Sequence, residues 1–307
     1  MKNKFDIIII IVILCCLLRA NVSTVAAASF NGSDAEVIHI ERISLNKNAI
    51  SIAAGETDTL KVKYVPENTT ERDVIWSSSN PKCCEVDENG TITAKSLANK
   101  VVIKASTPDG VLAATCNVRV LFSDVTNPNL AAYDAIYWGT DKGIVAGYGS
   151  YFDIDAGCTR AQVVMFLWRA AGKPKPKGSE LKFRDAAKIE KMAPDYKKAI
   201  LWGNEKGIVM GFTAGENAGC FKPNDPCTRG QILTFLWRYG GQKPAKSGAV
   251  TFPDVPKTHK YYKAIMWASS YGIARGFHSP PERNGKFMPD IECTRGQCIT
   301  FIYKMLN

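Results

Sequence analysis

The chain of 307 residues is long enough for two or three domains, and its composition, with 46% hydrophobic residues, excludes a largely disordered protein. Its formal net charge of +10 is unevenly placed: residues 1–120 carry 13 basic and 13 acidic residues, whereas residues 121–307 carry 26 and 16. A basic surface favours an acidic partner, such as a nucleic acid, an anionic lipid or an anionic polysaccharide. It is equally typical of an ordinary soluble surface.

Residues 1–28 are expected to form a secretory signal peptide. Lys2 and Lys4 give a positive start, and the apolar run from Ile7 to Leu18 is too short to span a bilayer comfortably. Ala26-Ala27-Ala28 supplies a small-residue cleavage site. An uncleaved membrane anchor is the alternative. Export argues against a nucleic acid as the acidic partner.

Residues 37–120 are predicted to form β-strands. Val37 to Leu45 and Thr59 to Val65 alternate apolar and polar residues, which is the period of a half-buried strand. Turn signals separate the runs at Pro66-Glu67-Asn68, Glu88-Asn89-Gly90 and Pro108-Asp109-Gly110. Short strands at this spacing predict an all-β antiparallel sandwich.

Three motifs in this segment are those of a known family: Gly55-Glu56-Thr57, Trp76-Ser77-Ser78-Ser79-Asn80 and Ala114 to Val120. With them, residues 37–120 resemble the bacterial Ig-like domain of group 2 over nearly their whole length. The resemblance implies an Ig-like sandwich that serves as a spacer on a surface protein or, in some members, as an adhesin.

A stretch that begins with Cys-Thr-Arg occurs three times, at residues 158–169, 227–238 and 293–304. Repeats of this kind are typical of stacked supersecondary units. In every copy the Thr is followed three residues later by Gln, which predicts a helix start with a capping box. Neither capping nor packing explains the Arg at the first helical position, because a cation there opposes the helix dipole.

Each unit also opens with Phe-x-Asp and continues with a helical run containing Ala-Ile-x-Trp. The aspartates are Asp124, Asp185 and Asp254, and the tryptophans are Trp138, Trp202 and Trp267. With these motifs in this order, residues 121–307 resemble the S-layer homology (SLH) family, as three repeats at 121–172, 181–241 and 250–307. The chain departs from the family pattern at five positions, with Gln162, Gln231 and Gln297 where Glu is common, and Gly230 and Gly296 where Ala is common.

The SLH resemblance implies a mainly α-helical spindle with three prongs and a central three-helix bundle. It also implies binding to an anionic, often pyruvylated, secondary cell-wall polysaccharide of a Gram-positive-type envelope. The motif arginine of the family corresponds to Arg160, Arg229 and Arg295. We expect these arginines to contact the polymer, because a guanidinium binds a carboxylate bidentately and a helix start brings free backbone N–H groups close to an anion.

Two other sets of residues are candidate polysaccharide contacts with alternative roles. Asp124, Asp185 and Asp254 are also the ion-pair partners of the arginines if those arginines are structural. The indoles of Trp138, Trp202 and Trp267 can stack on a sugar face, although their place beside Ala-Ile on a helix favours a position in the core.

Eight cysteines remain after removal of the signal peptide. Cys158, Cys227 and Cys293 occupy equivalent positions before the capping threonines, which favours buried thiols acting as small hydrophobic residues. The best disulfide candidates are Cys84–Cys116 and Cys220–Cys227. The spacing of the cysteines predicts no metal site, and no cofactor is expected.

The sequence therefore predicts an exported, non-enzymatic protein at the cell wall or cell surface of a Gram-positive-type bacterium. In this interpretation an Ig-like spacer precedes three polysaccharide-binding repeats. The alternative is an adhesin whose Ig-like domain binds a host or neighbouring-cell ligand while the repeats tether it. A wall-polysaccharide-processing enzyme is a third reading with little support, because His39, His259 and His278 are scattered and no catalytic triad pattern is present.

Overall fold

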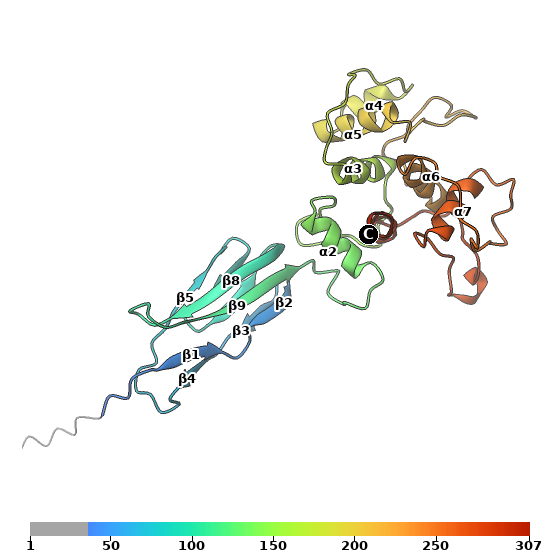
Figure 1. Cartoon of the computed structure of the whole chain (residues 1–307). Helices are drawn as coiled ribbons and strands as arrows, with labels where there is room; N and C mark the ends of the chain where they lie inside the picture. Colours follow the sequence, from blue (N-terminus) through green and yellow to red (C-terminus); the bar gives the residue numbers. More distant parts are fainter. Residues whose placement is uncertain (1–35) are drawn as a thin grey trace, which may run out of the picture.

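The computed structural model describes residues 36–307, with a strand-rich region from Arg42 to Leu121 followed by a helical region from Tyr133 to Leu306 (Figure 1). This order agrees with the predicted β-rich and α-rich halves. The predicted signal peptide, residues 1–28, lies outside the described residues.

The strand-rich region contains two main sheets and a smaller strand pair. The strands are β1 (Arg42–Leu45), β2 (Ala49–Ala53), β3 (Thr57–Thr59), β4 (Val62–Val65), β5 (Ile75–Ser78), β6 (Cys84–Val86), β7 (Thr91–Ala94), β8 (Ala98–Ser106) and β9 (Ala113–Leu121). One sheet has the order β2-β9-β8-β5, the other β3-β7-β6, and β1 pairs with β4. The prediction of purely antiparallel pairing is wrong at one place, because β2 runs parallel to β9, with Ala49 opposite Asn117 and Ala53 opposite Leu121.

The core of this region is built by residues that alternate along the strands. Ile103 of β8 and Cys116 of β9 are fully buried, and they cluster with Ile92 and Cys84 from the other sheet. Their neighbours in sequence point outward, which is the two-residue period of a strand with one buried face. Alternation along β8 and β9 therefore positions this core.

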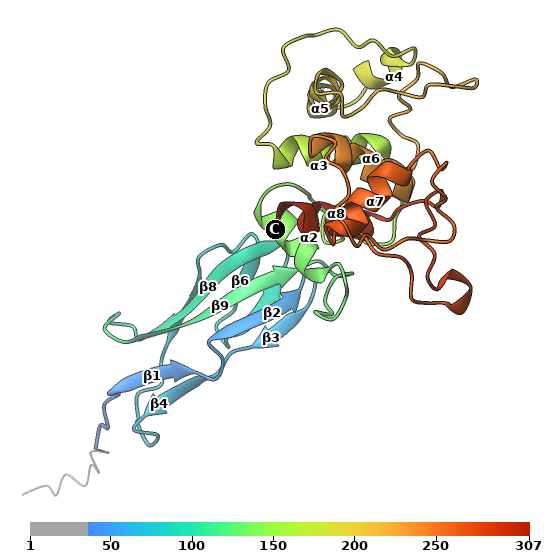
Figure 2. The same cartoon turned by 45° about the vertical axis from the view of Figure 1, so that its right-hand side comes forward.

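The helical region consists of three units, each with two principal helices. The helices are α2 (Tyr133–Asp141), α3 (Arg160–Ala170), α4 (Ala186–Glu190), α5 (Pro194–Glu205), α6 (Arg229–Tyr239), α7 (Tyr262–Ser270) and α8 (Arg295–Leu306), with a 3₁₀ turn η1 at Pro281–Arg283. Each unit ends with a helix that packs on the first long helix of another unit: α3 on α5, α6 on α7, and α8 on α2 (Figure 2). The third unit therefore packs back on the first.

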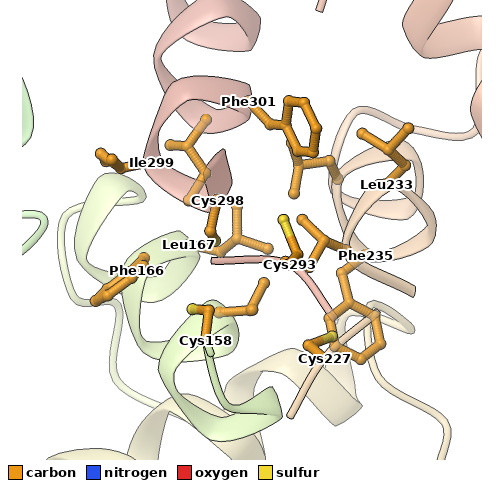
Figure 3. Close-up of a cluster of buried hydrophobic side chains, with 14 of the residues drawn as sticks. Cys158, Phe166, Leu167, Cys227, Leu233, Phe235, Cys293, Cys298, Ile299 and Phe301 are labelled. Carbon is orange, nitrogen blue, oxygen red and sulfur yellow. The ribbon is translucent and has the colours of Figure 1, made fainter. Parts of the chain in front are cut away.

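A closed ring of backbone hydrogen bonds lies at the centre of the three units. The amide of Cys158 donates to the carbonyl of Cys293 (2.9 Å), that of Cys227 to Cys158 (2.8 Å), and that of Cys293 to Cys227 (3.0 Å). The three side chains are fully buried beside Leu167 and Cys298 (Figure 3). The units thus close on themselves instead of stacking in an open row.

The two regions are joined through direct contacts around Tyr137 of α2. Its hydroxyl accepts a hydrogen bond from the amide of Phe122 (3.0 Å) and donates to the carbonyl of Val125 (2.7 Å). Arg119 of β9 lies 4.6 Å from the centre of the Tyr137 ring and 3.3 Å from a carboxylate oxygen of Asp141. Burial raises the pKa of Tyr137, so its phenol stays neutral and serves as a hydrogen-bonding joint.

Candidate functional site

The helix starts of the three repeats are capped, although not identically. In α3 and α6 the capping Thr accepts from the amide of Gln three residues on, and the Gln side chain accepts from the Thr amide, so both predicted capping boxes are confirmed. In α8 only the first half is present, since Thr294 accepts from the Gln297 amide (3.2 Å). There Oε1 of Gln297 accepts instead from Nη1 of Arg229 (3.4 Å).

The first two amides of each of these helices are also occupied. The Arg160 amide donates to the carbonyl of Asp225 and the Ala161 amide to that of Pro223, both at 3.0 Å. Equivalent bonds run from α6 to residues 289 and 291, and from α8 to residues 154 and 156. The expectation that free backbone N–H groups face an anion is therefore wrong, because a loop of another repeat uses them.

The three motif arginines are almost completely buried, with 2–4% of each residue exposed. Nε of each donates to the carbonyl of a phenylalanine in another repeat: Arg160 to Phe221 (2.7 Å), Arg229 to Phe287 (3.0 Å) and Arg295 to Phe152 (3.0 Å). The guanidinium of each also lies 4.5–4.6 Å from the centre of the nearest aromatic ring, within the range of cation–π attraction. These contacts explain why a cation stands at the first helical position, because the arginine side chain binds a neighbouring repeat and not its own helix.

The aspartates of the Phe-x-Asp motifs bind the backbone amides of the same phenylalanines whose carbonyls accept from the arginines. Asp124 accepts from the Phe152 amide (2.8 Å), Asp185 from Phe221 (2.8 Å) and Asp254 from Phe287 (2.9 Å). Each also accepts from the next amide, at 2.7 Å, and those next residues have φ of 56–66°. The ion-pair alternative is wrong, because no aspartate of this set pairs with a motif arginine among the described ion pairs.

A groove in the described part of the chain reaches the motif arginine Arg160. We call it the Arg160 groove; its volume is about 390 Å³. It is lined by Arg160, the 211–214 loop, the α6 residues Gln231, Thr234, Phe235 and Arg238, and Lys260 and Tyr261 before α7. Within the described residues neither Nη atom of Arg160 has a hydrogen-bond partner, so both remain available to a ligand. Burial lowers the pKa of Arg160, yet an arginine stays protonated in a protein.

The tryptophans lie away from this groove. Trp202 and Trp267 are buried, and Trp138 is half-buried. Trp138 packs edge-on against Tyr303 with ring centres 5.2 Å apart, and Trp202 against Tyr239 at 6.1 Å. In this structure the indoles belong to the packing between helices, and none lines the Arg160 groove.

Lys260, Tyr261, Phe212 and Arg238 are groove residues that the sequence analysis missed. A weak signal for Tyr261 existed in the replacement of the family's common Ala by Gly230. A Cβ at residue 230 would overlap the Tyr261 ring, so glycine is required for the ring to lie on the helix start. Phe212 and Arg238 lie where Tyr148 and Arg169 lie in the first repeat, and only the fold shows that they converge with Lys260.

All eight cysteines of residues 36–307 are free thiols. Neither predicted disulfide, Cys84–Cys116 or Cys220–Cys227, is formed. Cys84 and Cys116 are buried as small hydrophobic residues in the core of the strand-rich region. Cys227 is buried at the centre of the three helical units, whereas Cys220 is half-exposed in a loop. Burial raises the pKa of Cys227, Cys293 and Cys298, which keeps them as unreactive thiols.

We expect a thiol reagent such as Ellman's reagent, at pH 8, to modify rapidly only the half-exposed Cys83 and Cys220 of the folded protein. All eight cysteines should react after unfolding in guanidinium without reductant, because no thiol is consumed in a disulfide. The signal-free chain should be used, since Cys15 and Cys16 lie in the predicted signal peptide. Recovery of only six or four thiols from the unfolded protein would contradict this assignment.

Within residues 36–307 no set of three or more His, Cys, Asp or Glu side chains is arranged to hold a metal ion. No helix among these residues has the length and apolar character needed to cross a membrane.

Comparison with protein families gives matches to two domain types. Residues 39–118 match the bacterial Ig-like domain (group 2), and residues 122–164, 182–233 and 251–279 match the S-layer homology domain. The third match stops before α8, although α8 repeats the contacts of α3 and α6, with Arg295 in the place of Arg160.

Known relatives share parts of the chain. An uncharacterized protein of Clostridium acetobutylicum is 46% identical over 89 residues, which are 29% of this chain and 22% of that protein. A cell surface protein of Thermoanaerobacter kivui is 33% identical over 103 residues, which are 32% of this chain and 13% of that protein. An uncharacterized protein of Bacillus cereus is 30% identical over 95 residues, which are 30% of this chain and 70% of that protein.

Proposed function

This chain carries a bacterial Ig-like domain of group 2 followed by three S-layer homology repeats, and we propose that it is a cell-surface anchor whose repeats bind an anionic, pyruvylated cell-wall polysaccharide. S-layer homology domains generally bind secondary cell-wall polymers, and both domain types are non-catalytic modules of surface proteins. The family matches and the cell surface protein of T. kivui indicate a location at the cell surface. In this proposal the Ig-like domain is a spacer.

The observation that carries the proposal is the Arg160 groove. Three cations line it, namely Arg160, Arg238 and Lys260, and one acidic residue, Asp290, lies 3.3 Å from Lys260. The planar guanidinium of Arg160 presents two unpartnered Nη atoms, which suits the two oxygens of a carboxylate. Phe212 and Phe235 flank it with ring centres 4.6 and 5.2 Å from the guanidinium carbon, and these apolar neighbours strengthen the attraction between the arginine and an anion.

In the proposed arrangement α3, α6 and α8 form the central bundle of a three-pronged spindle, and the grooves lie between the prongs. The contacts of α6 with both α3 and α8 support this arrangement, as does the hydrogen-bonded ring of Cys158, Cys227 and Cys293. In the same proposal the two sheets of the Ig-like domain form a sandwich.

Replacement of Lys260 by alanine is the test with the least risk to the fold. Lys260 is exposed and forms an ion pair with Asp290, which is exposed as well. We expect Lys260→Ala to weaken retention on purified cell wall about fivefold, equal to the ~1 kcal/mol of one exposed ion pair. The exposed Lys206→Ala, outside the groove, is the matched control and should bind like the wild type. Depyruvylated wall and raised salt should weaken wild-type binding.

Equal retention of Lys260→Ala and Lys206→Ala at every salt concentration would contradict the assignment of the groove. Unchanged binding to depyruvylated wall would show that another anion of the polymer is recognised.

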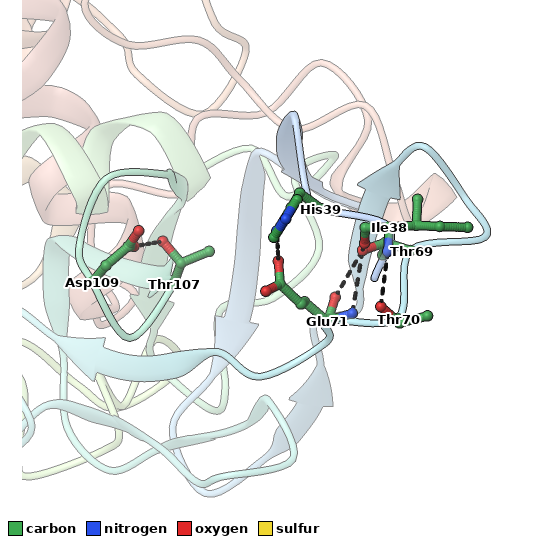
Figure 4. Close-up of polar contacts among 7 residues, drawn as sticks. All are labelled: Ile38, His39, Thr69, Thr70, Glu71, Thr107 and Asp109. Carbon is green, nitrogen blue, oxygen red and sulfur yellow. Dashed lines mark hydrogen bonds and ion pairs between the residues drawn. The ribbon is translucent and has the colours of Figure 1, made fainter. Parts of the chain in front are cut away.

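The alternative function is adhesion by the Ig-like domain, and one surface favours it. At the end remote from the repeats, the 107–112 turn and residues 70–73 enclose a hollow of about 610 Å³. Thr69 donates to the carbonyl of Ile38 (2.6 Å), the Ile38 amide donates to Thr70 (3.1 Å), and Thr107 hydrogen-bonds Asp109, which fixes both loops (Figure 4). Lys260→Ala also separates the two functions. It should weaken retention on the cell wall by the repeats, whereas binding of a surface ligand by the Ig-like domain should stay unchanged.

A further inference from the structure

The three motif arginines differ in one neighbouring residue, which follows the second glycine of each repeat. Tyr148 faces Arg295, Phe212 faces Arg160, and Phe277 faces Arg229, with 4.8, 4.6 and 4.5 Å between each ring centre and the guanidinium carbon. The hydroxyl of Tyr148 is one difference, and the backbone gives a second: Gly211 has φ 72°, whereas Gly147 and Gly276 lie outside the left-handed region.

The hydroxyl of Tyr148 completes the hydrogen bonding of Arg295. It accepts from Nη1 of Arg295 (3.4 Å) and from Nε2 of Gln162 (2.7 Å). Nη2 of Arg295 donates to the carbonyl of Ala146 (2.9 Å), and Nε to that of Phe152 (3.0 Å). Every guanidinium nitrogen of Arg295 therefore has a partner from the protein itself.

Arg229 is satisfied in another way, and Arg160 is not. Nη1 of Arg229 donates to Gln297 (3.4 Å) and Nη2 to the carbonyl of Arg275 (3.1 Å). At Arg160, Phe212 offers no hydroxyl, and Gln231 is held in its capping box by the Thr228 amide (3.2 Å). The carbonyl of Met210, which precedes Gly211 as Ala146 precedes Gly147, accepts no hydrogen bond from Arg160. A carboxylate that approaches Arg160 therefore displaces no protein group, whereas at Arg295 it must displace the Tyr148 hydroxyl from Nη1 and the Ala146 carbonyl from Nη2.

We propose that the segments 146–148 and 210–212 determine which arginine site takes ligand: the 210–212 segment leaves both Nη atoms of Arg160 open, and the 146–148 segment closes the Arg295 site with the Tyr148 hydroxyl and the Ala146 carbonyl. This inference rests on the proposed binding of an anionic sugar at the Arg160 groove. It adds that the three repeats are unequal, with one open site in the wild-type chain. Tyr148 is 57% exposed, so its hydroxyl can be removed or displaced without opening the core.

The test is a reciprocal exchange in the full chain, Tyr148→Phe and Phe212→Tyr, each of which changes a single hydroxyl. The probe is a methyl hexoside carrying a 4,6-pyruvate ketal, because a monovalent ligand counts sites in calorimetry. We expect one site in the wild type, still one in Tyr148→Phe because Nη2 of Arg295 stays bound to the Ala146 carbonyl, and at least about fivefold weaker binding in Phe212→Tyr, as expected when about 1 kcal/mol of hydrogen bonding must be displaced. Two or three equal sites in the wild type, or unchanged binding in Phe212→Tyr, would overturn the proposal.

A second measurement separates this inference from the proposed function. In ¹⁵N-arginine NMR spectra without ligand, the Nη hydrogens of Arg295 should exchange with water at least about fivefold faster in Tyr148→Phe, while those of Arg229 stay unchanged. Faster exchange with no sugar binding in any variant would refute the proposed ligand but keep the closure by Tyr148. Unchanged exchange in Tyr148→Phe would refute the closure itself, whatever binds.

Discussion

Replacement of Arg295 by alanine is expected to lower the free energy of unfolding of the repeats by about 3–5 kcal/mol, because several buried charge-assisted hydrogen bonds are lost and their acceptors are left without partners. Its Nε and Nη2 bind the carbonyls of Phe152 and Ala146, both in the first repeat. The loss should therefore separate the last repeat from the first. Denaturation in urea, followed by tryptophan fluorescence, measures the effect.

The matched control is Lys206→Ala, which removes one positive charge from an exposed position. It should change the free energy of unfolding by less than about 0.5 kcal/mol. Arg295→Lys should destabilise nearly as much as Arg295→Ala, because a lysine cannot place three donors in one plane. If Arg295→Ala unfolds like the wild type and loses wall binding, the residue is a ligand contact and its structural assignment here is wrong.

Replacement of Asp124 by alanine should cost about 2–4 kcal/mol of unfolding free energy, since a carboxylate that accepts several backbone N–H groups contributes strong hydrogen bonds. Asp124 accepts from the amides of Phe152 (2.8 Å), Asp153 (2.7 Å) and Ile154 (3.1 Å). It also holds Asp153 at φ 66°, a conformation that costs energy for a residue with a side chain. Without the carboxylate this loop should relax and release the carbonyl that Arg295 binds.

Asp155→Ala is the control, because Asp155 is exposed in the same loop and has the same charge. The stability of Asp124→Asn should lie between those of Asp124→Ala and Asp155→Ala. The oxygen of the Asn side chain accepts hydrogen bonds, but its NH₂ group opposes the remaining backbone amide donors. Thermal unfolding of the three variants at one pH gives the order. Equal stability of Asp124→Ala and Asp155→Ala would contradict the role of Asp124.

The local features of the repeats could be predicted from the sequence, because their causes lie within four residues. Thr159 and Gln162 form their capping box within one helical turn, so spacing alone was sufficient. The box of Thr294 failed because Arg229, from another repeat, competes for the Gln297 side chain. No local pattern encodes such a competitor.

The role of the arginines could not be predicted, because each partner lies in another repeat. Arg295 and Phe152 are 143 positions apart, and the sequence does not show that the last repeat meets the first. The same limit applies to the strands, where alternation located β1 and β4 but gave no sign that β2 and β9 pair in parallel. For the cysteines, an even number in an exported chain suggested bridges, whereas burial gives each sulfur a packing role instead.

The closed ring also restricts how such a protein can change in copy number. In an open array a repeat can be gained or lost while the others keep their nearest-neighbour interfaces. Here deletion of one repeat removes a phenylalanine carbonyl that an arginine binds. Insertion of a fourth repeat would separate two repeats whose hydrogen bonds close the ring. The three repeats should therefore be gained or lost only together, as one set. A circular permutant whose chain is opened in the 173–180 linker would keep every inter-repeat hydrogen bond described above. Those hydrogen bonds, and not the covalent chain, close the ring.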